Sequence, residues 1–274
     1  MTSITQQQFD GPGRVAFREC GRGAPLVLLH GVGMQSAAWA PQIAALSCDH
    51  RVLALDLPGH GGSAPLPGRP QLPDYVDWLH GVLEGLGLGP VCLVGHSMGA
   101  MIATGYAVTH PRHVRRVALL NGVYQRDPQA RRAVIARAEE IRAGAVDLET
   151  PLDRWFGQDP DTDTDTETVR AQVRGWLAAM DPKGYADAYG AFAAGDGIYA
   201  PKMGEIAAPL LTLTGALDPN STPAMARDMA RAAPHGRAVV LDGARHMANL
   251  TAPEEVNAAL TAWLRDGTAE RRRA

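Results

Sequence analysis

Cysteine is scarce in this chain of 274 residues, and recognisable metal or cofactor motifs are missing. The three cysteines, Cys20, Cys48 and Cys92, are scattered and form no CxxC pair. This usage indicates neither a disulfide framework nor a zinc site, and it is typical of reduced thiols in a cytoplasm. The sequence also has no glycine-rich dinucleotide fingerprint and no Walker lysine. We therefore expect neither a metal nor an organic cofactor.

Signals for export, for a membrane and for nucleic acid are missing as well. The first ten residues lack the basic and apolar segments of a signal peptide, and no apolar run approaches the roughly 20 residues that span a bilayer. A net charge of −3 gives no attraction to nucleic acid or a membrane surface. The basic run at residues 271–273 is interpreted as a solvated tail. We expect a cytoplasmic protein with a small-molecule partner, and the sequence carries no signal for a particular oligomeric state.

What the sequence does have is an alternation of short apolar runs and helical patterns. Nearly continuous apolar runs predict strands that are buried on both faces of a parallel sheet. They occupy residues 25–30, 51–57, 91–96, 115–120, 209–215 and 237–243. Residues 13–20 alternate weakly before the turn Gly21-Arg22-Gly23, which predicts an opening antiparallel hairpin strand. Helical stretches between the runs predict βαβ units with right-handed crossovers.

The pattern changes after Gly122. From residue 123 to about residue 200 the sequence shows helical periodicity and no convincing strand. Within this stretch Thr164-Asp165-Thr166-Glu167 matches a capping box and predicts a helix that continues to Met180. We therefore predict an α/β fold in which a mostly parallel sheet, residues 1–122 and 201–274, is interrupted by a helical cap at residues 123–200.

A serine stands where a strand is predicted to end and a helix to begin. Gly95-His96-Ser97-Met98-Gly99 is a G-x-S-x-G pentapeptide in that context. In a nucleophile elbow the sharp turn strains the nucleophile's backbone, and the flanking glycines let strand and helix approach each other. An ordinary small-residue turn is the alternative, but the strand before and the helix after favour the elbow. We predict that Ser97 is a nucleophile near the positive end of the following helix.

An acid and a base follow in the chain order that such a nucleophile requires. A serine hydroxyl needs a general base within hydrogen-bond reach, and the expected order is Ser, then Asp or Glu, then His. Asp218 and His246 each come just after one of the last two apolar runs. Because the carboxyl ends of parallel strands share one edge of the sheet, we predict a Ser97–Asp218–His246 triad. The alternatives are a turn-forming Asp218, the nearer acid Asp242, and a structural His246.

Attack by a serine creates an oxyanion that needs preorganised donors. One predicted donor is the backbone N–H of Met98, directly after the nucleophile, and the other is the N–H of Val32 in the loop after the first parallel strand. His30 and His96 adjoin these loops. Since one base suffices, we interpret both as structural or pocket-lining, and His60 in the same way.

Five motifs together resemble the α/β-hydrolase superfamily over nearly the whole chain. They are HGVG at residues 30–33, DLPGHGGS at 56–63, GHSMGA at 95–100, ALD at 216–218 and GARH at 243–246. The resemblance implies an eight-stranded, mostly parallel sheet with its first pair antiparallel, flanked by helices and covered by an all-helical cap. Three shorter stretches, at residues 152–156, 179–185 and 246–250, are most similar to 3-oxoadipate enol-lactonase-like carboxylic ester hydrolases.

The resemblance implies a serine hydrolase that cleaves a small carboxylic ester or lactone through an acyl-enzyme on Ser97. Carbon–carbon bond hydrolases of ring-cleavage products use the same triad, but they usually carry Asn at the position of His96 and Trp at that of Met247. Relatives with an aspartate nucleophile are disfavoured by the serine at the elbow. A ligand receptor of the same fold with vestigial hydrolysis is an alternative of another class, and the intact triad argues against it.

We expect substrate selection to lie in the cap. Trp155 and Phe156 are large apolar residues there and are candidates for lining the pocket, together with His30 from the core. Packing of the cap onto the core is the alternative for both aromatic side chains. An enol-lactone substrate would carry a carboxylate, for which Arg132 and Arg154 are candidate partners.

Overall fold

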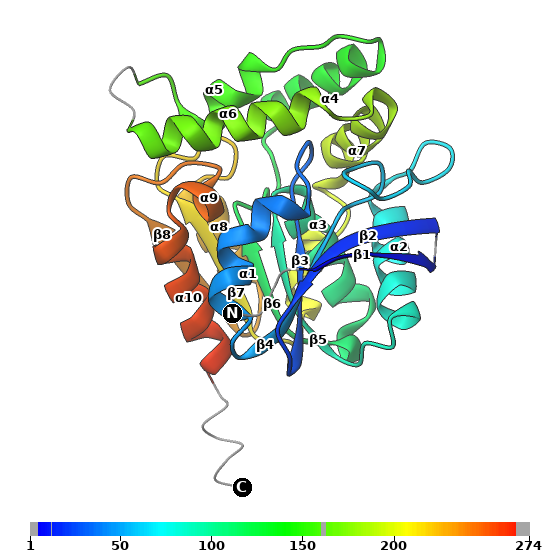
Figure 1. Cartoon of the computed structure of the whole chain (residues 1–274). Helices are drawn as coiled ribbons and strands as arrows, with labels where there is room; N and C mark the ends of the chain where they lie inside the picture. The colour runs from blue at the N-terminus through cyan, green and yellow to red at the C-terminus, as the bar shows by residue number, and fades with distance from the viewer. Residues whose placement is uncertain (1–4, 12, 160–162, 267–274) are drawn as a thin grey trace, which may run out of the picture.

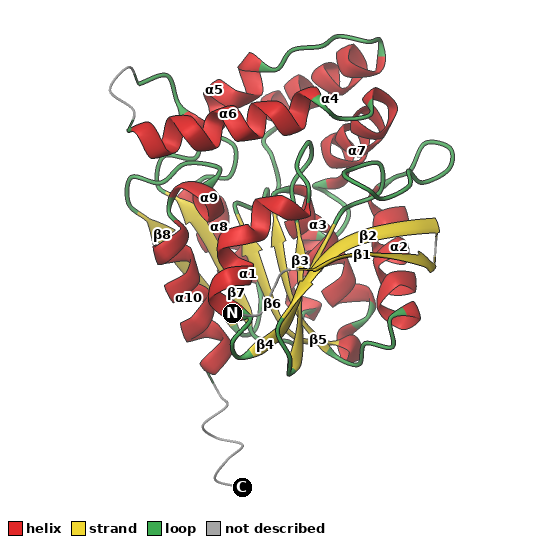
Figure 2. Ribbon diagram, viewed as in Figure 1, coloured by secondary structure: helices red, strands yellow, loops and turns green. Residues whose placement is uncertain are grey.

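The computed structural model describes residues 5–11, 13–159 and 163–266, and it shows one eight-stranded sheet with helices on both sides (Figures 1 and 2). The basic run at residues 271–273 lies outside the described residues. The strand order is β1-β2-β4-β3-β5-β6-β7-β8, antiparallel at the β1/β2 and β2/β4 pairs and parallel elsewhere. The strands are β1 (Thr5–Gly11), β2 (Gly13–Cys20), β3 (Ala24–Leu29), β4 (His50–Leu55), β5 (Val91–His96), β6 (Val114–Leu120), β7 (Leu210–Gly215) and β8 (Gly236–Leu241).

This architecture confirms the predicted fold, with one difference at its start. The sequence predicted a hairpin turn at the glycines of residues 21–23, whereas the hairpin joins β1 to β2, and β2 pairs with β4 on its other side. β1 (TQQQFDG) is polar and lies at the edge of the sheet, so it lacks the apolar pattern that identified the other strands.

Two apolar cores cover the two faces of the sheet. α2 (Leu72–Gly85), α3 (Met98–Thr109) and α8 (Pro223–Ala232) pack on one face, and α1 (Ala40–Leu46) and α10 (Pro253–Arg265) pack on the other. The central strands are buried on both faces, and all six residues of β5 are buried. Burial of this kind requires the continuous apolar runs seen in the sequence. No helix in the described ranges is both long and apolar enough to cross a bilayer.

We call residues 123–200 the cap and the rest of the described chain the core. The cap contains α4 (Pro128–Arg142), α5 (Glu149–Phe156), α6 (Thr164–Ala178) and α7 (Pro182–Gly195), followed by the short helix η3 (Ala200–Glu205). α4, α5 and α6 lie above the carboxyl ends of the strands (Figure 1). α6 begins one residue earlier than the predicted capping box implies, because the side chain of Asp163, and not that of Thr164, accepts the N–H of Thr166 at 2.9 Å.

Cap and core meet at a close backbone contact. A Cβ atom on Gly59, in the loop after β4, would lie 2.7 Å from the Cα atom of Gly184 in α7. Only glycine at these positions allows the first turn of α7 to rest on the core. The contact places the cap helices over the edge of the sheet where the strands end.

Candidate active site

Ser97 lies at the end of β5 and directly before α3, as the sequence predicted. Its backbone has φ 53° and ψ −113°, an unfavourable conformation for a residue with a side chain. The Ser97 N–H donates to the carbonyl of Leu120 at 2.9 Å, which holds the turn against β6. A Cβ atom on Gly95 would lie 2.1 Å from the carbonyl oxygen of Gly99, and one on Gly99 would lie 2.2 Å from the carbonyl oxygen of Leu29, so these glycines let α3 approach both β5 and β3. This geometry presents a strained serine at the start of a helix.

Asp218 and His246 form a buried pair. His246 Nδ1 lies 2.7 Å from Asp218 Oδ2, and the two residues are each 3% exposed. The other carboxylate oxygen, Oδ1, accepts the backbone N–H groups of Asn220 at 2.8 Å and Ser221 at 3.2 Å. Burial alone would raise the pKa of Asp218, but the His246 ring and the donated hydrogen bonds outweigh it and hold the pKa below its ordinary value. Asp218 is therefore ionised at neutral pH, and it holds the Nδ1–H tautomer that leaves the lone pair of His246 on Nε2.

Asn121 is a component of the site that the sequence analysis missed. Its side-chain Nδ2 donates to Asp218 Oδ2 at 2.8 Å, and its backbone, with φ 47°, occupies the left-handed region. Asn121 follows the last residue of β6 at the same edge of the sheet as Asp218. The available signal was a polar residue directly after a buried strand. Asn121 fixes the carboxylate oxygen that also accepts the His246 proton.

The loop after β3 lies next to Ser97 because of the sheet register. Leu29 pairs with Gly95 of β5, and a Cβ atom on Gly31 would lie 3.0 Å from the Cβ of Ser97. Val32 lines the same cavity as Ser97, and no described residue accepts its backbone N–H. The N–H of Met98 is in the first turn of α3, where helices leave amides unpaired. The two backbone N–H groups that were predicted as oxyanion donors thus lie near Ser97 with no acceptor among the described residues.

Buried histidines bind backbone groups around this edge of the sheet, and two of them, His60 and His96, fix the site's loops. His60 Nε2 accepts the Gly33 N–H at 3.0 Å, and burial lowers the pKa of His60 to about 4. His96 donates from Nε2 to the carbonyl of His246 at 2.8 Å, and burial lowers the pKa of His96 to about 3. Both rings are therefore neutral at neutral pH, and they fix the loops that carry the site.

His30, which we predicted to line the pocket, does not reach it. Its Nδ1 donates to the carbonyl of Gly31 at 2.8 Å, its Nε2 accepts the N–H of Leu57 at 2.9 Å, and the residue is 1% exposed. Burial holds the pKa of His30 well below its ordinary value. The ring turns toward the β4 loop and not toward the cavity, so adjacency in sequence to the oxyanion loop was a misleading signal.

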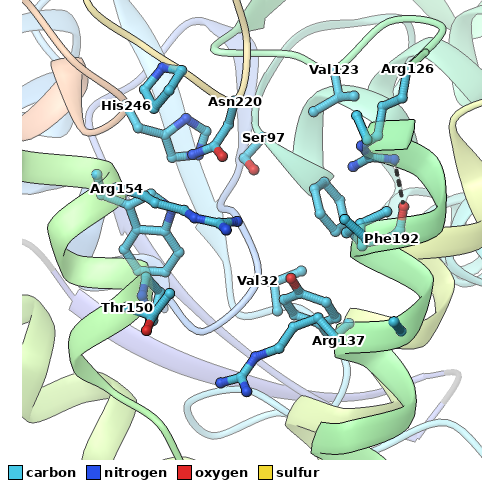
Figure 3. A pocket seen from close by; sticks show the side chains of 18 of the residues that line it. Val32, Ser97, Val123, Arg126, Arg137, Thr150, Arg154, Phe192, Asn220 and His246 are labelled. Atoms are coloured by element: carbon cyan, nitrogen blue, oxygen red, sulfur yellow. Dashed lines mark hydrogen bonds between the residues drawn. The ribbon is translucent and has the colours of Figure 1, made fainter. Parts of the chain in front are cut away.

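A cavity of about 640 Å³ opens between the triad and the cap, within the range of small-molecule sites. Ser97 and His246 both line it, and their polar atoms face it in Figure 3. Trp155 also lines it, and its ring stacks on that of His246 with centroids 6.0 Å apart. Phe156, the second predicted aromatic residue, is 5% exposed and packs in a separate apolar cluster between cap and core, outside the cavity lining.

The two candidate arginines differ in position. Arg154 lines the cavity, whereas Arg132 is exposed on α4 and is not part of the lining. Arg126 and Arg137 line the cavity as well, which the sequence analysis had not foreseen. The cavity wall formed by the cap is therefore rich in guanidinium groups.

A group of possible metal ligands lies at the other edge of the sheet. Among the described residues, His80, Glu84 and His113 each offer a ligand atom within 4.8 Å of the others. His113 directly precedes β6, so this group is at the amino ends of the strands. An ion bound there would not touch the triad.

Known proteins include relatives that are similar to this chain over most of its length. A family model described as the alpha/beta hydrolase family matches residues 26–259. The (E)-2-((N-methylformamido)methylene)succinate hydrolase of Acinetobacter baylyi is 52% identical over 246 residues, which cover 90% of this chain and 92% of the relative.

Two solved structures share the whole fold. The enol-lactonase from Burkholderia xenovorans LB400 superposes with a TM-score of 0.84 and 26% identity, covering 94% of this chain and 99% of its own. A thermophilic esterase from Thermogutta terrifontis, with malate bound, has a TM-score of 0.85 and 26% identity and covers 95% and 98% of the two chains.

Proposed function

The chain belongs to the alpha/beta hydrolase family, and on that premise we propose that it is a serine hydrolase of small dicarboxylate substrates, acting through an acyl-enzyme on Ser97. The observation that carries the reaction type is the buried Asp218–His246 pair, which opens onto the cavity that Ser97 also lines. The substrate class rests on the 52% identity to the succinate-derivative hydrolase of Acinetobacter baylyi.

In the first step His246 takes the hydroxyl proton of Ser97 as Oγ attacks the substrate's carbonyl carbon. Asp218 keeps the imidazole in the required tautomer and stabilises the imidazolium that forms. The oxyanion is bound by the backbone N–H groups of Val32 and Met98, with the positive end of α3 behind it. These donors are in place before the substrate arrives, so little reorganisation is needed.

The relative's substrate, named above, contains an N-formyl group on a nitrogen that is conjugated through a double bond with a carboxylate. For a substrate of this kind the formyl C–N bond breaks as His246 returns the proton to nitrogen. The nitrogen is a good leaving group because its electron pair is delocalised onto the conjugated carboxylate. Water, activated by His246, then cleaves the formyl ester on Ser97. One water is consumed, and formate and the enamine diacid are released.

Two further observations support a dicarboxylate. Malate, the molecule bound to the Thermogutta terrifontis esterase, is a four-carbon dicarboxylate. The cavity of this chain also presents guanidinium groups, which bind carboxylates well. Both observations are independent of the relative's name.

A second candidate is cleavage of an ester or lactone, as first predicted from the sequence, and it needs no change in the machinery. It is supported by the likeness to the Burkholderia xenovorans enol-lactonase. Carbon–carbon cleavage, the alternative prediction, is supported by the conjugated, acyclic acid skeleton of the Acinetobacter baylyi enzyme's substrate. All three reactions begin with attack on a carbonyl carbon.

The test is a substrate panel on the purified protein: the formyl enamide, an enol lactone, a vinylogous diketone and p-nitrophenyl acetate. We expect the highest kcat/KM on the enamide, with formate released in equal amount to substrate consumed. Ser97→Ala should lower kcat by about 10⁴-fold or more on every substrate that reacts. Retention of most activity in Ser97→Ala would exclude the proposed nucleophile. A preference for the lactone or the diketone would leave the assignment of Ser97 as nucleophile intact, but it would change which bond of the substrate the protein is proposed to cleave.

A further inference from the structure

Three guanidinium groups meet on the cap wall of the cavity. Arg126, Arg137 and Arg154 come from different parts of the cap and all line it. Their common neighbour is Tyr189: burial raises the pKa of this phenol, and the charges of Arg154, Arg137 and Arg126 act against that rise. Three cations that line one cavity and act on one hydroxyl give this wall positive charge, which favours an anion.

Two of the three cations already have acid partners in the cap. Arg126 Nη1 lies 3.5 Å from Asp196 Oδ1, and its guanidinium stands 4.4 Å above the ring of Phe192. Arg137 lies 3.2 Å from both Glu140 and Asp147. The side chain of Arg126 is 7% exposed and that of Arg137 is 24% exposed, so both are held within the wall.

Arg154 differs from both. Within the described part of the chain it has no ion-pair partner, and the adjacent acid, Asp153, pairs with Arg170 at 2.7 Å instead. In Figure 3 the Arg154 side chain extends from α5 into the open part of the cavity below Ser97, whereas the guanidinium of Arg137 points away from Ser97. Arg154 is thus a charged donor placed where substrate must lie.

The position of Arg154 is fixed by the residue that follows it. Trp155 stacks on the His246 ring, with an angle of 23° between the ring planes. This contact holds α5 beside the catalytic base, so the guanidinium is near the reacting carbonyl and not at the distant rim. The surrounding wall includes Val32, Val123 and Phe192, whose apolar surfaces strengthen a charge-assisted hydrogen bond.

We propose that Arg154 binds a carboxylate of the substrate and selects anionic acyl compounds over neutral ones. This inference rests on the proposed function, because it assigns the carboxylate recognition that a dicarboxylate substrate requires. A guanidinium fits a carboxylate through two parallel N–H donors, a geometry that lysine cannot reproduce. Arg126 and Arg137 keep the neighbouring wall positive without themselves being free to turn toward the substrate.

The experiment uses two esters with the same leaving group, p-nitrophenyl acetate and the mono-p-nitrophenyl ester of succinate. We expect Arg154→Ala to lower the ratio of kcat/KM for the succinate ester to that for the acetate by about 10- to 100-fold, the range for a hydrogen bond to a charged group. Arg154→Lys should lose part of this selectivity. Because the ratio is measured on one protein sample, a partly unfolded variant does not distort it.

Arg132→Ala is the matched control, since it removes the same charge from an exposed site of the cap. It should leave the ratio within about twofold of the original. An unchanged ratio in Arg154→Ala, or an equal fall in Arg132→Ala, would overturn the inference. These outcomes are separate from failure of the proposed function, which would appear as no turnover of the enamide or as activity that survives Ser97→Ala.

Discussion

The carboxyl edge of the sheet and the cap wall that faces it are built differently. At the sheet edge Asp218 and His246 are each 3% exposed, and the Asp218 carboxylate accepts four hydrogen bonds. Across the cavity Arg154 is exposed and has no ion-pair partner within the described residues. The first arrangement is complete before substrate arrives, as electrostatic catalysis requires. The second is incomplete, as expected of a surface that gains its partner only on binding.

The largest effect should come from a substitution at the sheet edge that changes the hydrogen bonding of Asp218 but keeps the shape of its side chain. Asp218→Asn should lower kcat on p-nitrophenyl acetate by about 10⁴-fold, because the amide donates to His246 Nδ1 and forces the wrong tautomer. Asp242→Asn is the matched control, since Asp242 is exposed after β8 and was the nearer acid in sequence. Steady-state kinetics on both variants decide the point. Equal losses, or more than a tenth of the original kcat in Asp218→Asn, would contradict the assignment.

Lowering the pH should destabilise the core through its buried histidines, which have no counterpart in the cap. His30, His60 and His96 are buried with pKa values lowered by burial, to about 4 for His60 and about 3 for His96, whereas the cap contains no histidine. Below pH 6.5 these histidines are protonated in the unfolded chain but stay neutral in the folded chain. The free energy of unfolding therefore rises with pH in this range and falls on acidification. Each histidine should contribute about 1.4 kcal/mol per pH unit, until the pH approaches its folded pKa.

The measurement is urea unfolding between pH 7 and pH 5. We expect the free energy of unfolding to fall by about 2 kcal/mol per pH unit from His60 and His96 in the lower half of that range, and His30 should add to this slope. His235→Gln, which changes an exposed core histidine, should leave the slope as it is. A stability that stays level from pH 7 to pH 5 would contradict the buried, neutral state of these rings.

Features of this edge could be predicted where neighbouring residues in the sequence determine them, and not where a distant segment does. Ser97, Asp218 and His246 follow closely after strands of the sheet, so strand runs and chain order were enough to predict that they lie at this edge. β1 was missed because its polar residues pair at an edge that no apolar core covers. His30 was misjudged because the direction of its ring is set by the Leu57 N–H, which belongs to another strand's loop.

The cap was less predictable for a physical reason. Helical periodicity indicates that helices exist, but it does not say which face meets the core or how α5 docks. Arg132 and Arg154 were equivalent candidates in the sequence, and only the docking of α5, with Trp155 stacked on His246, places Arg154 rather than Arg132 in the cavity lining. Pairing of Arg126 with Asp196 joins residues 70 positions apart, which no local pattern reveals.

A smaller effect on kcat is expected from Asn121, which donates a hydrogen bond to Asp218. Asn121→Gly removes the hydrogen bond to Asp218 and still tolerates the positive φ, so it should lower kcat about tenfold with little change in KM. Asn121→Ala adds backbone strain and should lose about 1 kcal/mol more stability. Kinetics and urea unfolding on the two variants separate the roles. If Asn121→Gly keeps full kcat, Asn121 is structural and does not position Asp218.

The smallest effect should come from the aromatic residue of the cap. Trp155→Ala removes the ring that stacks on His246 and should lower kcat/KM by about five- to tenfold, near 1 kcal/mol for an aromatic pair. Trp176→Ala is the control, because Trp176 packs on the same apolar cluster without lining the cavity. Thermal unfolding should show a similar loss for both variants. If kinetics are also equal, Trp155 only packs the cap onto the core.

The central claim is that Ser97 carries an acyl group during turnover, and this can be measured directly. Acid quenching of the protein during hydrolysis of p-nitrophenyl acetate, followed by proteolysis and mass spectrometry, should find an acetyl ester on the peptide that contains Ser97. The adduct should be absent from Ser97→Ala. Full turnover with an unmodified Ser97, or an adduct on another residue, would contradict the account.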